Sequence, residues 1–66
     1  MNVAKLRGKM TEKGFNVERL APMIGIDRAT LYRKLNNWEK ITIGEALKMK
    51  DVLEMTDDEA GLIFFG

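Results

Sequence analysis

One short segment of the chain carries hydrogen-bonding side chains at helical spacing. On a helix that turns about 100° per residue, one face of this segment presents Arg28, Ala29, Tyr32, Arg33 and Asn36. Arg pairs with guanine, Asn pairs with adenine, and a small apolar side chain can touch the thymine methyl group in a DNA major groove. A helix face that only meets water more often carries Glu and Lys four residues apart. The segment therefore predicts a surface that reads DNA bases.

The residues before this segment predict how the helix is seated. Ala21 is followed by Gly25 four positions later and by Leu31 six positions after that. Two helices that cross steeply after a tight turn need a small residue where they approach and a glycine in the turn, so this spacing indicates a helix-turn-helix. Leu31 and Leu35 suffice to anchor the second helix of the pair. Tyr32 lies to the side of the Leu31 face, so its ring can face either DNA or the core.

Capping residues mark the starts of four helices. At each, an apolar residue precedes the cap and a second one follows four positions after it, as in a hydrophobic staple; the caps are Asn16, Asp27, Thr42 and Thr56. An apolar stripe near the N-terminus adds a first helix. We expect helices over about 3–13, 17–24, 28–36, 43–53 and 57–64 and no strand, hence a single all-α domain over residues 1–66.

Five further residues carry specific expectations. Pro22 removes a backbone donor, so we expect a kink or an irregular first turn in the second helix. Leu47 and Leu53 should supply the inner side of the fourth helix, together with Met49. The aromatic ring of Trp38 should plug the loop 37–41 against the core rather than stack on a base.

Composition argues against catalysis and for a charged partner. The chain of 66 residues has no His or Cys, and also no Ser, so the usual nucleophiles and general base are missing. The net charge of +1 conceals a segregation, because residues 1–40 hold nine Lys or Arg and four Asp or Glu, whereas residues 41–66 hold two and six. The acidic run 57–59 is explained by the helix dipole, so we predict neither a metal nor a cofactor.

The run ERLAPMIGIDRATLYRKL, with a basic helix before it and two further helices after it, resembles the Cro and repressor helix-turn-helix proteins of temperate phages and related bacterial regulators (the XRE-like family). The resemblance implies a compact five-helix lambda-repressor-like domain that represses transcription. Such a protein binds a pseudo-palindromic double-stranded DNA operator as a homodimer and can be a monomer when free. It also implies a soluble protein at the nucleoid of a bacterial cytoplasm, with no membrane and no small-molecule substrate.

The resemblance carries site residues over by position. Base reading falls to the same five residues, Arg28, Ala29, Tyr32, Arg33 and Asn36. Backbone contacts fall to Asn16, Val17, Thr30, Asn37 and Lys40, with Lys34 as a further candidate. The chain departs from the family at Val17, where many relatives have Gln, so that only the backbone amide can contribute.

The C-terminal LIFFG segment suggests an interface. Three consecutive bulky residues, Ile63 to Phe65, cannot all face the core of their own helix, so at least one should be exposed. We expect Phe64 and Phe65 to contribute to a dimer, although Phe65 could instead fold back as an apolar cap. An antirepressor-like protein-interaction module, which keeps the helix-turn-helix as a scaffold, is the alternative function.

Overall fold

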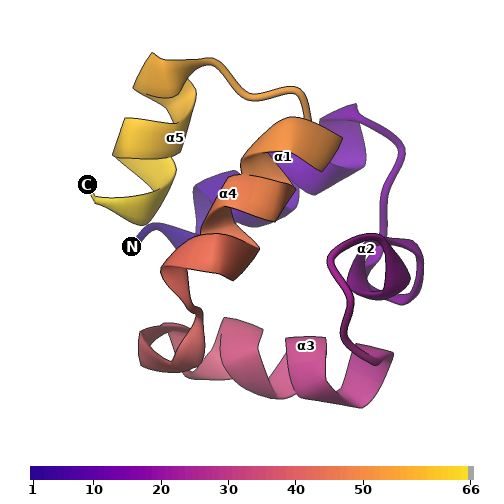
Figure 1. Ribbon diagram of the computed structural model, residues 1–66. Coiled ribbons are helices and arrows are strands. Elements are labelled where there is room, and N and C mark those ends of the chain that lie inside the picture. Colours follow the sequence, from indigo (N-terminus) through magenta and orange to yellow (C-terminus); the bar gives the residue numbers. More distant parts are fainter. Residues whose placement is uncertain (66) are drawn as a thin grey trace.

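The computed structural model describes residues 1–65, and this part of the chain is entirely helical apart from turns. Its elements are α1 (Val3–Glu12), α2 (Val17–Met23), α3 (Arg28–Asn36), the 3-10 helix η1 (Trp38–Lys40), α4 (Ile43–Val52) and α5 (Asp57–Phe64). Figure 1 shows α3 and η1 along the lower edge, with α4 rising from that edge and α5 at the upper left. The predicted five-helix, all-α architecture is confirmed.

The predicted caps are present at all four positions. Each cap side chain accepts a hydrogen bond from the backbone amide three residues later, and the donors are Arg19, Thr30, Glu45 and Glu59. The carboxylates of Glu45 and Glu59 in turn accept hydrogen bonds from the amides of Thr42 and Thr56, both at 2.9 Å, which completes two capping boxes. A fifth cap, Asn2 on the Lys5 amide at 3.0 Å, was not predicted.

Helix bounds agree closely with the predictions. The helices α3 and α5 have the predicted bounds, whereas α1, α2 and α4 each end one residue earlier. The residues involved, Lys13, Ile24 and Leu53, are C-caps, whose amides still bond to the helix although their own dihedral angles have left it.

The irregularity expected from Pro22 is not in the first turn of α2. The Leu20 amide donates to the Asn16 carbonyl at 2.9 Å, as in an ordinary first turn. The helix has seven residues, so Pro22 lies near its end and removes only the bond to Glu18. In the last turn, the Ile24 amide is shared between the carbonyls of Leu20 and Ala21, as is common at helix ends.

The pair α2 and α3 meets at a buried seam closed by a glycine turn. Leu20, Ala21 and Leu31 are fully buried. Gly25 has φ +82°, in the left-handed region that residues with a side chain rarely adopt. The Ile26 amide donates to the Ala21 carbonyl at 3.1 Å and closes the turn. The turn and the seam together fix the angle at which α3 leaves α2.

A single apolar cluster occupies the space between the helices. Its buried members are Leu6, Met10, Val17, Leu20, Ala21, Ile24, Leu31, Leu35, Met49, Leu53, Met55, Ala60 and Ile63. The prediction that Leu47 faces inward is wrong, because its side chain is 58% exposed. Two residues before Met49 is a rotation of about 200°, so Leu47 and the buried Met49 lie on opposite faces of α4.

Ion pairs join α5 to the rest of the molecule. Lys9 of α1 lies 2.8 Å from Glu12 and 2.7 Å from Glu59, and Lys50 of α4 lies 2.8 Å from Asp57. The hydrogen bond from the Lys9 ammonium lowers the pKa of Glu59 from its ordinary 4.5 to about 2, and the Thr56 amide acts in the same direction. The carboxylate is therefore charged in the folded protein well below its usual range.

Replacing Leu31 by Ala should destabilise the fold by about 2–5 kcal/mol, because the leucine is fully buried at the seam. Leu47→Ala makes the same chemical change on an exposed face and should cost less than about 1 kcal/mol. Denaturant unfolding monitored by circular dichroism measures both, and a Leu31→Ala variant already unfolded in water would also agree. Equal losses for the two variants would contradict the assigned seam.

Glu59→Gln should lower stability near neutral pH, while its amide oxygen still caps the Thr56 amide. Because the folded pKa of Glu59 lies below its ordinary value, its contribution is present above 4.5 and lost as the pH falls through about 2. The melting temperatures of wild type and variant should thus differ at about pH 7 and converge toward pH 2. Glu39→Gln, which removes a carboxylate without an ion pair among residues 1–65, should show no such convergence.

Candidate nucleic-acid interface

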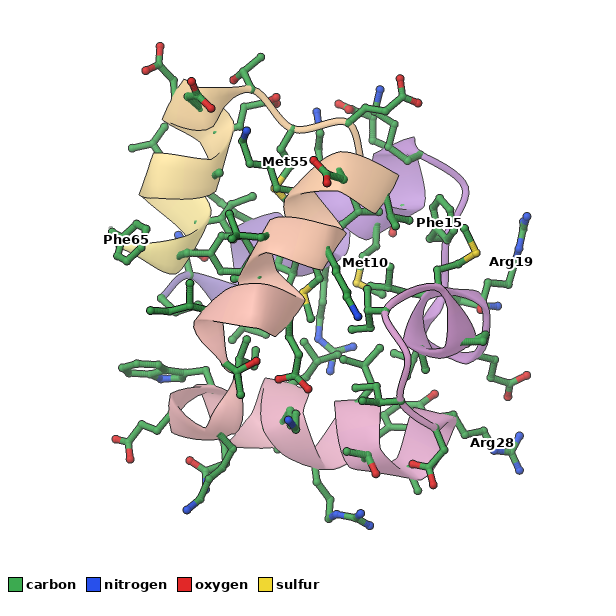
Figure 2. The ribbon with its side chains drawn as sticks, viewed as in Figure 1. Met10, Phe15, Arg19, Arg28, Met55 and Phe65 are labelled. Carbon is green, nitrogen blue, oxygen red and sulfur yellow. The ribbon has the colours of Figure 1, made fainter. Side chains whose placement is uncertain are left out.

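The helix α3 turns one face to the core and leaves the other to solvent. Leu31 is fully buried and Leu35 is 3% exposed, and they seat the helix as predicted. All five predicted base-reading residues are exposed: Arg28, Ala29, Tyr32, Arg33 and Asn36. Figure 2 shows Arg28 projecting from the end of α3 into solvent. The structure thus brings these five side chains together on one open face.

The two guanidinium groups on this face have only weak internal partners. Arg28 lies 3.2 Å from the carboxylate of Glu18, and both side chains are largely exposed. Arg33 donates to the hydroxyl of Thr30 at 3.2 Å. Exposed pairs of this kind contribute little to stability, so either guanidinium group can exchange its partner for a base edge or a phosphate. Thr30 is half-buried and in a position to orient Arg33.

Tyr32 lies between the α3 face and the start of α2. Its side chain is 46% exposed, and it lines a shallow hollow with Asn16 and Val17 of α2 and with Arg7 and Thr11 of α1. The tyrosine therefore covers part of the junction of three helices and leaves its other side open. Its two predicted orientations are both partly realised.

The start of α2 offers backbone amides rather than side chains. The side-chain oxygen of Asn16 is engaged by the Arg19 amide at 2.8 Å, so this side chain has only its amino group to offer. Val17 is 6% exposed and belongs to the core. Because the Arg19 amide is capped by Asn16, the first-turn amides that can bind phosphate oxygens are those of Val17 and Glu18. Because the Val17 side chain is buried, only its backbone amide is left to contact DNA at this position.

Arg7 is a basic residue at this junction that the sequence did not single out. It is exposed, and it shares the hollow with Asn16 and Tyr32. The one available signal was the basic character of the first helix, which does not indicate the direction of any one side chain. Arg19 is basic but engaged, because it donates to the Gly14 carbonyl at 2.9 Å and lies over the Phe15 ring.

A second hollow extends the α3 face toward η1. It is lined by Thr30, Arg33, Lys34, Asn36, Asn37 and Lys40. Base-reading and backbone candidates thus share one continuous surface. Asn37 and Lys40 are exposed, and the turn that holds them is closed by the Lys40 amide, which donates to the Asn37 carbonyl at 3.0 Å.

Lys34 is largely withdrawn from this surface. Its ammonium contacts both carboxylate oxygens of Glu45, at 2.7 and 2.6 Å, and its side chain is only 18% exposed. Lys34, a candidate for DNA contact, is therefore already paired within the protein.

Apolar side chains gather where η1, α4 and α5 meet. A hollow there is lined by Met1, Trp38, Glu39, Ile41, Ile43, Ala46, Phe64 and Phe65. The expectation that Trp38 plugs the core is wrong, because its side chain is 47% exposed and η1 holds it at the rim. Phe64 is half-buried and Phe65 is 86% exposed, so Phe65 does not fold back as a cap. Figure 2 shows Phe65 at the edge of the molecule.

Residues 1–65 contain no group of three or more acidic side chains placed to hold a metal ion. The described helices are also too short and too polar for any of them to cross a membrane.

We compared the sequence with models of known protein families. The model of the Cro/C1-type HTH DNA-binding domain, of the XRE family, matches residues 5–59, which include the whole α2–α3 pair. Comparisons with curated proteins and with solved structures found no significant match. The family match covers most of the chain, and its description is of a DNA-binding domain, not an enzyme. With the exposed polar face of α3 and the glycine turn before it, the match shows that the chain belongs to the Cro/C1-type helix-turn-helix DNA-binding domain family.

Proposed function

We propose that this protein is a Cro-like transcriptional repressor that reads a pseudo-palindromic operator by inserting α3 into the major groove as a homodimer. The observation that supports it most is the continuity of the α3 face with two flanking hollows. One hollow leads to Asn16 and the other to Lys40, so both edges of the groove have polar contacts available. In this proposal the protein acts on DNA at the nucleoid of a bacterial cytoplasm.

Contacts divide between bases and backbone in this proposal. Bases are read by Arg28, Ala29, Tyr32, Arg33 and Asn36. Phosphates are held by Asn16, the Val17 amide, Asn37, Lys40 and Arg7, and Thr30 orients Arg33 beside them. The base contacts carry specificity, whereas the phosphate contacts fix the position of the domain and make the affinity depend on salt.

The distribution of acidic residues supports this orientation. The connection from α4 into α5 holds Glu54 and leads into the first turn of α5, which holds Asp57 and Asp58. This connection lies at the opposite end of the molecule from α3 in Figure 1. An acidic end directed away from the duplex avoids repulsion by the phosphates.

The proposed dimer surface is the apolar hollow that contains Trp38, Ile43 and Phe65. This hollow adjoins the proposed DNA-facing surface, because η1 supplies Trp38 to the apolar hollow and Lys40 to the proposed operator contact. A second copy bound there brings two α3 helices onto one side of a duplex, as a palindromic site requires. The alternative is an antirepressor-like module, for which the same apolar surface would bind a different protein.

Selection of bound sequences from random duplex DNA tests the proposal as a whole. The expected result is a two-fold symmetric consensus with half-sites about one helical turn apart. No enrichment at low salt would favour the antirepressor-like alternative.

Arg33→Ala should weaken binding to the selected consensus by about 1–3 kcal/mol, because an arginine at the centre of the α3 face would lose its base partner. Lys13→Ala removes a positive charge at the exposed end of α1 and should change the affinity far less. Titration by fluorescence anisotropy measures both. An affinity of Arg33→Ala within twofold of wild type would show that Arg33 does not read a base.

Phe65→Ala should weaken binding to the full operator by about tenfold while leaving half-site binding unchanged, because it truncates an aromatic side chain at the proposed dimer contact. Leu62→Ala is a matched control, since Leu62 is 56% exposed on the same helix but lines a different hollow with Lys5 and Lys9. Full-site and half-site duplexes are compared by gel shift. Equal cooperativity in wild type and Phe65→Ala would exclude Phe65 from the dimer contact.

A further inference from the structure

One carboxylate connects the recognition helix to α4. Glu45 receives the Lys34 ammonium on both oxygens, at 2.7 and 2.6 Å, and also accepts the Thr42 amide at 2.9 Å. The Glu45 side chain is 13% exposed and that of Lys34 is 18% exposed. The pair thus joins the second half of α3 to the capping box that starts α4, largely out of water.

This pair adds a polar link to α4 beside the buried anchors Leu31 and Leu35 of α3. The helix packs mainly against α2 and η1, and among residues 1–65 Lys34 and Glu45 form its ion pair with α4. Burial raises the pKa of Glu45, but the hydrogen bonds from Lys34 and Thr42 outweigh it and lower the pKa overall. The carboxylate is therefore charged at neutral pH and holds the lysine firmly.

Lys34 lies close to the surface that we propose contacts DNA. Lys34 lines the hollow shared with Asn37 and Lys40, next to Arg33. Released from Glu45, its flexible stem could carry the ammonium to a backbone phosphate. Such a contact would strengthen binding to every sequence equally and add no discrimination.

We infer that Glu45 is a specificity-determining positioning residue, which through Lys34 fixes the angle of α3 on α4 and withholds one positive charge from the DNA backbone. This inference rests on the proposed function, because the angle of α3 matters only if that helix reads bases. Base contacts tolerate little displacement, whereas phosphate contacts tolerate more.

The test compares Glu45→Gln, Lys34→Met, the double variant and Lys34→Arg on the selected consensus and on random duplex DNA across a salt series. Glu45→Gln retains an oxygen for the Thr42 amide and frees Lys34. Random-DNA affinity should then rise on the order of threefold to tenfold, and the slope of log affinity against log salt should steepen by about 0.9. The ratio of consensus to random affinity should fall about fivefold.

Lys34→Met separates the two roles of the pair. It loosens α3 without freeing a charge, so the specificity ratio should fall while random-DNA affinity and the salt slope stay as in wild type. The double variant should match Lys34→Met, and Lys34→Arg should restore wild-type behaviour because it retains the ion pair. Glu39→Gln, an exposed carboxylate on η1, controls for the loss of negative charge alone.

Each contrary outcome has a distinct meaning. A lower random-DNA affinity and a shallower slope for Lys34→Met would show that Lys34 already binds phosphate, which overturns the inference. The same affinity gain from Glu45→Gln in the Lys34→Met background would assign the effect to charge repulsion, which also overturns it. Failure of wild type to prefer its consensus would instead overturn the proposed function, and this inference with it. Circular dichroism melts of each variant verify folding before the titrations.

Discussion

The structure depends first on the buried seam between α2 and α3. Leu20, Ala21 and Leu31 are fully buried there, and Gly25 adopts the left-handed conformation that allows the chain to reverse over them. This contact sets the direction in which the outer face of α3, the proposed reading face, points. A larger residue in the place of Ala21 would displace α3 and, with it, all of the proposed reading residues.

Charged residues perform two separate tasks in this small domain. Lys9, Lys34 and Lys50 are paired with acidic residues and tie α1, α3 and α5 to their neighbours. Arg28 and Arg33 have only weak, exposed partners and stay available for a ligand. A thin core therefore gains support from ion pairs that use cations other than these two arginines, and the net charge alone does not report how many cations remain free.

The same physical limit explains the exposed apolar surface around Trp38. A chain of 66 residues buries a smaller share of its surface than a larger domain does, and the Trp38 side chain on η1 stays 47% exposed. The ring instead meets Ile43 and Phe65 at a rim beside the DNA-facing loop. In the proposed dimer, this apolar group is the contact between the two copies.

The sequence by itself determined the helices and the open face of α3, because capping residues, apolar spacing and a glycine turn are local signals. Cap bonds at Asn16 and Asp27 and the burial of Leu31 follow those signals directly. Only the tertiary structure decided which side chains meet between helices. Four features depend on how distant segments pack. They are the exposure of Leu47, the position of Trp38 at the edge of its hollow, the hollow that Arg7 and Tyr32 share, and the ion pair between Lys34 and Glu45. No local pattern encodes those distances, since each is set by the angles between helices and the shape of the shared core.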